Sequence, residues 1–288
     1  MIYLILSIIC SVTVGAIFKI SKKHDTCTTQ IVTWNYVFAL ILCYIFFNPD
    51  LSMAAPKAHW SLYTPLVILL PSIFHLMATS IKHMGIVRTD AAQRLSLFIP
   101  IIAAWLIFRE NFSTLKLAGL AVGFPAILLI LAKKKEESPS RNWMFPVLVL
   151  FGFGIIDVLF KHVAILPSPS YTTSLFFIFC GSLAVTMLVV LYQVIILKIS
   201  LKLMSLAFGA LVGIFNFGNI LFYLKAHKEF AENPSTVFAA MNMGVIVVGS
   251  IAGIFIFKEK LSKWNYMGIV LALLAIVLIT LSQVYKGV

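Results

Sequence analysis

The sequence predicts an all-α integral membrane protein with about ten transmembrane helices, arranged as two inverted five-helix repeats. The first observation is composition: 61% of the 288 residues are hydrophobic and only 11% are charged, whereas soluble domains carry about 25% charged residues. The second is a series of continuous apolar runs, each about as long as the roughly 20 residues that span a bilayer as a helix. The third is a boundary motif that recurs in both halves of the chain.

Polar or turn-forming stretches separate the apolar runs and set the limits of the predicted helices. The longest of these stretches, KKKEESPSRN (133–142), lies between the fifth and sixth runs. We therefore predict a first five-helix repeat at 1–135, a polar linker at 136–142 and a second five-helix repeat at 143–288. The ten predicted helices lie near 2–20, 28–47, 61–83, 89–108, 114–132, 143–163, 171–197, 203–226, 234–257 and 264–285.

The recurring motif reads FREN at 108–111 and FKEK at 257–260. At the same offset, Ser113 aligns with Ser262, Gly119 with Gly268, and Gln93 with Asn242. Because each half has an odd number of helices, the second half must enter the membrane in the opposite direction. Inverted repeats of this kind are common in secondary transporters, whose substrate site lies where the repeats meet.

The charged residues of the motif are interpreted as structural. We expect each glutamate to pair with an adjacent base at the membrane–water boundary, where a charge costs little. These boundary charges are Arg109, Glu110, Lys258 and Glu259.

The net charge of +12 does not indicate nucleic-acid binding, because the basic residues gather in loops between apolar runs. Lys and Arg are most frequent in the loops that follow odd-numbered helices, which predicts that those loops are cytoplasmic and that both termini lie outside. The predicted location is the cytoplasmic (inner) membrane, and the lipid bilayer is the expected surroundings. Oligomeric state is open, and a monomer is compatible with the pattern.

The sequence predicts neither an enzyme nor a metalloprotein. The four cysteines are far apart and show no CxxC spacing or histidine partner, so they fit small buried apolar side chains. No HExxH, G-x-S-x-G or Walker A pattern is present, and no cofactor is expected. The missing nucleotide-binding loop also argues against an ATP-driven pump.

Few ionisable residues fall inside the predicted helices. Each one raises the free energy of membrane insertion by about 2.5–3.5 kcal/mol, so each is expected to have a structural or functional role. Asp157 is either a proton or cation site or the structural partner of Lys161, one turn away. His75 is either a coupling residue or a hydrogen-bonded interior histidine. Arg94 either binds an anionic substrate group with its planar fork or extends to the interface. Pro100, two turns after Arg94, predicts a bend.

Neutral polar residues form the other group of cavity candidates. Asn216, Asn219 and Tyr223 make a polar stripe on the eighth predicted helix, and Asn35 is its counterpart on the second. Gln93 and Asn242 are amides at equivalent places in the two halves. Amides of this kind either bind a polar solute or hold helices together. Glycines near the stripe, at positions 209, 213 and 218, predict close helix approach.

Two five-helix halves, each with a helix that ends in an apolar–basic–Glu stretch before a glycine-containing last helix, resemble the EamA family of the drug/metabolite transporter superfamily. The stretches that carry the resemblance are FREN…KLAGLAVGFPAILLIL and FKEK…NYMGIVLALLAIVLIT, with Phe-Lys at 18–19 and 160–161. The resemblance implies secondary transport or facilitated diffusion of small metabolites through a central cavity. It also implies cytoplasmic termini, opposite to the orientation that the lysine distribution predicts.

The predicted function is therefore secondary transport of amino-acid-like or related polar solutes by alternating access. Two alternatives remain at this point, an exporter of drugs or amphiphiles and a non-transporting scaffold or sensor subunit. The cavity candidates are Asn35, His75, Gln93, Arg94, Asp157, Asn216, Asn219, Tyr223 and Asn242, with Asp157 and His75 as the coupling candidates.

Overall fold

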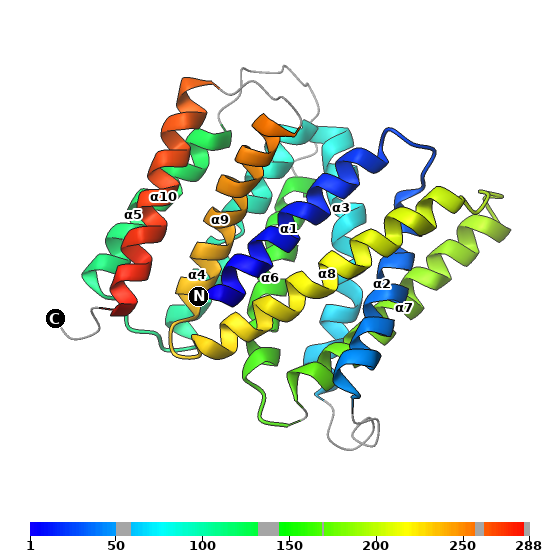
Figure 1. Ribbon diagram of the computed structural model, residues 1–288, viewed down its shortest axis with the longest axis horizontal. Coiled ribbons are helices and arrows are strands. Elements are labelled where there is room, and N and C mark those ends of the chain that lie inside the picture. The colour runs from blue at the N-terminus through cyan, green and yellow to red at the C-terminus, as the bar shows by residue number, and fades with distance from the viewer. Residues whose placement is uncertain (50–58, 132–143, 169, 257–261, 285–288) are drawn as a thin grey trace. The chain divides into compact units, whose positions relative to one another are not determined.

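The computed structural model describes residues 1–49, 59–131, 144–168, 170–256 and 262–284 (Figure 1). Within these ranges every regular element is an α-helix. Lys258, Glu259 and the predicted linker lie outside the described residues. The helices are α1 (Ile2–Ser21), α2 (Thr28–Phe47), α3 (Trp60–Leu95), α4 (Phe98–Leu106), α5 (Thr114–Leu131), α6 (Met144–Ile165), α7 (Tyr171–Ile195), α8 (Leu203–Glu229), α9 (Pro234–Phe255) and α10 (Lys263–Val284).

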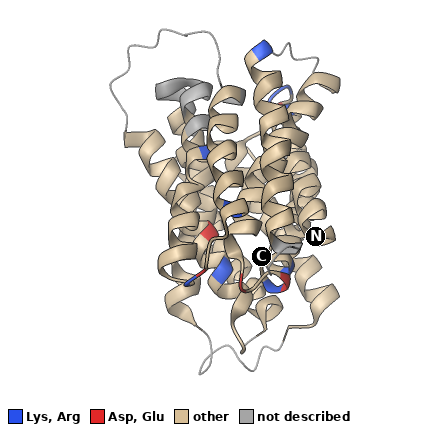
Figure 2. Cartoon of the chain, turned by 90° about the vertical axis from the view of Figure 1, so that its left-hand side faces the viewer, with Lys and Arg blue, Asp and Glu red and all other residues tan. Residues whose placement is uncertain are grey.

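Eight of the described helices are long and apolar enough to cross a membrane, among them the first part of α3, Trp60–Met77. Two shorter apolar stretches, Ala92–Leu106 and Thr114–Leu129, complete the set. Charged residues occupy few positions along the helical ribbon (Figure 2). The prediction of a multi-pass all-α membrane protein is confirmed.

The chain turns back within α3, near the break that the sequence predicts at 84–88. Helical backbone continues from Trp60 to Leu95, yet the hydroxyl oxygens of Ser80 and Thr89 lie 2.6 Å apart. In a straight helix, nine residues would separate these two positions by about 13.5 Å along the axis. The predicted division into helices at 61–83 and 89–108 is therefore wrong in its boundary, because α3 continues as one bent helix across 84–88 to Leu95.

A second interruption lies at Ser96 and Leu97, between α3 and α4. Pro100 explains it, because its ring nitrogen has no hydrogen to donate to the carbonyl of Ser96, four residues earlier. The backbone N–H of Ile99 donates to that carbonyl instead, at 3.0 Å. The predicted bend thus occurs one turn before the proline itself.

The described chain forms two compact units. Unit 1 comprises Met1–Ile8, Leu76–Val158 and Glu229–Val288, and unit 2 comprises Ile9–His75 and Leu159–Lys228. The predicted repeat boundaries fall on residues 132–143, outside the described ranges, so the division into 1–135, 136–142 and 143–288 stays a prediction.

The core of unit 1 is built on α5, α9 and α10, and Figure 1 shows α5 and α10 side by side. A Cβ added at Gly119 would lie 2.6 Å from the side chain of Ile279, and one added at Gly123 would overlap Met243 of α9. Further along α5, the carbonyl of Leu129 accepts a 3.2 Å hydrogen bond from Asn265, near the start of α10. The two helices are therefore antiparallel and close together, and the glycines make this approach possible.

Equivalent serines begin α5 and α10. The Ser113 hydroxyl accepts from the backbone N–H of Lys116 at 3.4 Å, and the Ser262 hydroxyl accepts from that of Asn265 at 3.2 Å. Both are N-cap contacts, which satisfy a backbone donor that the first turn of a helix leaves unpaired. Ser113 and Ser262, which the predicted repeat aligns, thus both act as N-caps, on two helices that run in opposite directions.

Unit 2 centres on α2, which packs against α7 and α8. On the α7 side, the rings of Tyr36 and Phe179 lie 6.2 Å apart, centroid to centroid. A cluster of Ile17, Ile31 and Val212 joins α1, α2 and α8. Apolar packing in lipid supplies little hydrophobic drive, so close fit and interhelical hydrogen bonds hold these helices together.

Candidate functional site

Two glycines bring α8 against α2 in unit 2. A Cβ on Gly209 would lie 2.3 Å from the Cβ of Trp34, and a Cβ on Gly213 would lie 2.8 Å from the carbonyl oxygen of Asn35. The spacing of four residues puts both glycines on one face of α8. This small-xxx-small pattern lets two backbones approach closely, as the sequence analysis expected of these glycines. Close approach then places the side chains one turn further along α8 within reach of α2.

Asn216 lies one turn beyond Gly213, and its amide Nδ2 donates a 3.0 Å hydrogen bond to Oδ1 of Asn35. Asn35 is fully buried and Asn216 is 9% exposed. Two residues that the sequence analysis named separately are thus in direct contact. Their hydrogen bond helps to hold α2 and α8 together, the packing role that was considered for Gln93 and Asn242.

The pair does not use all of its hydrogen-bonding capacity. Within the described part of the chain, Nδ2 of Asn35 is buried and has no hydrogen-bond partner. A buried donor without an acceptor costs about 1–3 kcal/mol relative to a satisfied one. An acceptor atom of a polar solute, or a water molecule, would remove that cost. We therefore take this amide nitrogen as the binding element of the candidate site.

The polar stripe continues along α8. Asn219 is half-buried, and Tyr223 is 6% exposed. The Tyr223 ring meets that of Phe160 edge-on at 6.4 Å and that of His227 at 4.6 Å. His227, fully buried one turn beyond Tyr223, extends the stripe by a residue that the sequence analysis did not name as a candidate. The sequence did contain a signal for this, because His227 follows Tyr223 by four residues and therefore lies on the same face of the helix.

Lys161 lies against the last turn of α8. Its Nζ donates to the carbonyl of His227 at 3.2 Å, and the residue is fully buried. A cation at a helix C-terminus satisfies an unpaired carbonyl and interacts favourably with the helix dipole. From the sequence, the predicted partner of Lys161 was Asp157, four residues earlier on α6. The end of α8 is a further partner that spacing along α6 alone does not reveal.

The remaining candidate of unit 2 is His75, which is half-buried on α3. Its neighbour Phe74 packs on Phe18 of α1, with ring centroids 5.5 Å apart. That contact packs this turn of α3 against α1. A coupling role for His75 stays a proposal.

Four candidates belong to unit 1, and all four are half-buried. Gln93 and Arg94 lie in the last turn of α3, where the Gln93 carbonyl accepts a 2.6 Å hydrogen bond from the Ser96 hydroxyl. Asn242 donates through Nδ2 to the Phe238 carbonyl of its own helix at 3.1 Å. Asp157 lies on α6. The amides Gln93 and Asn242 are not joined by any hydrogen bond described in the structure, so their symmetry in sequence does not produce a pair like that of unit 2.

The motif glutamate Glu110 is more deeply buried than the sequence analysis expected, with 3% of its surface exposed. Its carboxylate pairs with Lys116, which is 2% exposed, and accepts from the Ser235 backbone N–H at 2.9 Å and the Ser235 hydroxyl at 2.7 Å. Lys116 also donates to Oδ1 of Asn233 at 3.2 Å. Glu110 thus caps the N-terminus of α9, where a negative charge is favoured.

The expected pairing of Glu110 with its neighbour Arg109 is wrong, and the backbone explains why. Arg109 has a φ of 50°, and the N–H of Glu110 donates back to the Ala104 carbonyl at 2.9 Å. A residue in this left-handed conformation ends many helices. After such a turn the next residue leaves in a new direction, so Arg109 is exposed while Glu110 is buried.

No group of three or more His, Cys, Asp or Glu side chains with metal-binding geometry occurs among the described residues. The described hydrogen-bonding side chains in the spans are mostly neutral amides and hydroxyls. Such groups can bind and release a polar solute without forming a covalent intermediate.

Comparison with known proteins agrees with this picture. Residues 1–132 match the EamA-like transporter family. An uncharacterized protein from Haemophilus influenzae is 39% identical over 282 residues, a span that covers 95% of each chain. A solved crystal structure with 10% sequence identity superimposes with a TM-score of 0.73, covering 97% of this chain and 96% of that one. At that identity the crystal structure supports the fold alone.

Proposed function

Because the chain belongs to the EamA-like transporter family, we propose that it is a secondary transporter or facilitator of small polar metabolites across the cytoplasmic membrane. Transport would proceed by alternating access, with amino-acid-like solutes as the expected substrate class. The family is one of transporters rather than enzymes. Substrate binding in unit 2 would use Asn35 and Asn216.

The observation that supports a polar substrate is the unpaired amide nitrogen of Asn35. This donor belongs to a fully buried residue and has no described partner. Such an arrangement is unfavourable unless an acceptor reaches the donor in some state of the protein. A carboxylate or carbonyl oxygen of a metabolite is such an acceptor. A purely apolar solute would leave the donor unpaired.

Solute flux into proteoliposomes tests the proposal. Purified protein would be reconstituted and assayed by counterflow against neutral amino acids, amino-acid anions and polyols, with amphiphilic cations as a fourth class. We expect flux of at least one polar class above that of empty liposomes. Absence of flux for every class would contradict the transporter assignment for this protein.

Substitution of Asn35 tests the site separately from the function. Asn35→Leu keeps the approximate side-chain volume but removes the amide donor together with Oδ1, the acceptor of the Asn216 hydrogen bond, so we expect a fall in flux of at least about tenfold, the value of one buried hydrogen bond. Ser182→Ala is the matched control, because this buried hydroxyl of unit 2 already donates to the Val67 carbonyl at 3.4 Å. The control should transport as the wild type does. Equal flux from Asn35→Leu and Ser182→Ala would remove Asn35 from the site and leave the function standing.

A further inference from the structure

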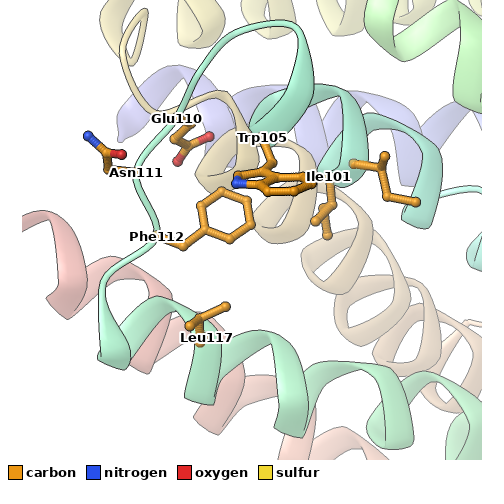
Figure 3. Close-up of a pocket in the computed structure, with 7 residues that line it drawn as sticks. Ile101, Trp105, Glu110, Asn111, Phe112 and Leu117 are labelled. Atoms are coloured by element: carbon orange, nitrogen blue, oxygen red, sulfur yellow. The ribbon is translucent and has the colours of Figure 1, made fainter.

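Exposed positive charge gathers at one end of unit 2, on the α1–α2 and α7–α8 loops (Figure 1). We call this surface the basic face, and its members are the exposed Lys22, Lys23 and Lys198 and the half-buried Lys202. By contrast, Glu110 is the one charged residue among the seven that line the open pocket at the end of α4 in unit 1, and Lys116 neutralises it (Figure 3). The basic face is therefore the stronger candidate for recognition of an ionic partner.

Hydrogen bonds join the two loops into one surface. The buried side chain of Gln30 donates through Nε2 to the Ser200 carbonyl and accepts from the backbone N–H of Lys202, both at 2.9 Å. The backbone N–H of Cys27 donates to the Ser205 hydroxyl, also at 2.9 Å. The lysines of the two loops are therefore held at the same end of the unit, although about 175 residues separate them in the chain.

The charge of the basic face is largely uncompensated. Asp25 is the only acidic residue in segments 22–27 and 196–202, and it pairs with Lys202 while 83% of its side chain stays exposed. An exposed pair of this kind contributes little to stability, so an external anion can compete for its lysine. Among the described residues, none forms an ion pair with Lys22, Lys23 or Lys198.

Apolar side chains surround the lysines of the α7–α8 loop. Leu197, Leu201 and Leu203 are 53%, 67% and 82% exposed, and they alternate with Lys198 and Lys202 along the chain. In a membrane-spanning protein such leucines contact acyl chains, while the ammonium groups beside them extend to the headgroups. An occupant that suits both kinds of side chain has an anionic head and an apolar body, as a phospholipid does. An acidic soluble protein would leave the leucines in water.

We propose that the basic face binds anionic phospholipids of the surrounding membrane, with their phosphates between the lysines of the two loops. Lysine binds phosphate as a point charge without a fixed hydrogen-bond geometry. The preference should therefore depend on the charge of the lipid rather than on the shape of its headgroup. Each basic residue near a membrane surface strengthens the attraction roughly fivefold. This inference concerns the bilayer and does not depend on which solute the protein transports.

Native mass spectrometry of the protein released from detergent micelles counts the lipids that stay bound. The purified chain would be titrated with phosphatidylglycerol, or with phosphatidylcholine that has the same acyl chains. We expect the wild type to bind phosphatidylglycerol at a concentration at least about tenfold lower, because more than one lysine contributes. Equal binding of the two lipids would overturn the proposal.

Two substitutions should change this preference in opposite directions. Lys198→Gln removes one cation and should weaken phosphatidylglycerol binding roughly fivefold. Asp25→Asn releases Lys202 from its ion pair and should strengthen the binding by a similar factor. Lys228→Gln is the matched control, because this exposed lysine lies in the last turn of α8, at the opposite end of the helix from Lys202, with its Nζ 5.6 Å from the centre of the Tyr171 ring. It should keep the wild-type preference.

Three results would contradict the proposal. An effect of Lys228→Gln as large as that of Lys198→Gln would show that total charge, and not the basic face, selects the lipid. Displacement of the lipid by an equal concentration of glycerol phosphate, the headgroup without acyl chains, would make the face a site for a soluble anion. Tighter binding of poly-glutamate than of phosphatidylglycerol would assign the face to an acidic protein partner.

Discussion

The carboxylate of Glu110 accepts a hydrogen bond from the backbone N–H of Ser235, 125 residues later in the chain. Through this contact the loop after α4 caps α9, while Lys116 pairs with the same carboxylate. The arrangement is a fully buried ion pair in unit 1. Breaking one partner of such a pair is far more destructive than replacing both, because it leaves an uncompensated buried charge.

Removal of the Glu110 carboxylate should therefore destabilise the protein strongly. Glu110→Ala leaves Lys116 buried and unpaired, and we expect a loss of about 3–5 kcal/mol in the free energy of unfolding. The double variant Glu110→Ala with Lys116→Met should recover a large part of that loss. Unfolding in detergent, followed by circular dichroism against denaturant, measures both.

The exposed ion pair of Asp25 and Lys202 is the control for this experiment. Asp25 has 83% of its side chain exposed, so Asp25→Asn should change the free energy of unfolding by less than about 1 kcal/mol. A Glu110→Ala protein as stable as Asp25→Asn would show that the buried pair contributes nothing.

A methyl group at Gly209 should push α8 away from α2. The new Cβ would lie 2.3 Å from the Cβ of Trp34 and 3.0 Å from the Ile31 carbonyl, so Gly209→Ala should lower the free energy of unfolding by about 1–3 kcal/mol. It should also reduce solute flux, because the Asn35–Asn216 hydrogen bond depends on this helix approach. Thermal unfolding and proteoliposome flux are the two measurements.

Gly15→Ala provides the matched substitution, since a Cβ at Gly15 of α1 would meet no described atom within 4 Å. Alanine is the better helix former, so this variant should be as stable as the wild type or about 0.5–1 kcal/mol more stable. Equal effects of the two substitutions would mean that close packing at Gly209 is not required.

Neutralisation of Arg94 should separate anionic from neutral substrates. Arg94→Gln keeps a donor but removes the charge, so flux of an anionic solute should fall at least about tenfold, while flux of a neutral solute persists. Counterflow with matched anionic and neutral amino-acid analogues measures the ratio. Equal losses for both solutes would contradict a counter-ion role for Arg94.

Neutralisation of Asp157 should uncouple transport from a proton gradient. In Asp157→Asn proteoliposomes we expect solute exchange to continue while accumulation driven by an imposed pH gradient is lost, because the group that binds the proton is gone. His75→Gln, measured in parallel, tests the second coupling candidate. Gradient-driven accumulation that survives in both variants would exclude both residues as coupling sites.

Helix positions were largely predictable, because each span must hold about 20 apolar residues whatever its tertiary partners. The predicted run at 28–47 coincides with α2, and the run at 203–226 ends within one turn of the end of α8. The bend near Pro100 was predictable from the missing N–H. The unbroken helical backbone across 84–88 was not, because polar residues in sequence indicate a break without showing how the chain turns.

Contacts between residues far apart in the chain could not be predicted from the sequence. Asn35 and Asn216 were both candidates, but nothing local indicates that two residues 181 positions apart share a hydrogen bond. The burial of Glu110 likewise depends on the backbone turn at Arg109 and on the start of α9. Sequence patterns report the surroundings of a residue along its own helix, and these two features arise between helices.

The antiparallel packing of α5 on α10 also sets an order of events during synthesis. Gly119 is synthesised before Ile279, which it contacts in the folded core. At about 5–20 residues per second, the interval between the synthesis of the two residues is roughly 10–30 s. Until α10 is made, the part of α5 around Gly119 that will contact Ile279 faces lipid or the insertion machinery. Because α10 follows α5 and α9 in the chain, it is the helix that completes the core of unit 1, and a chain truncated before α10 would be a natural target for membrane proteases.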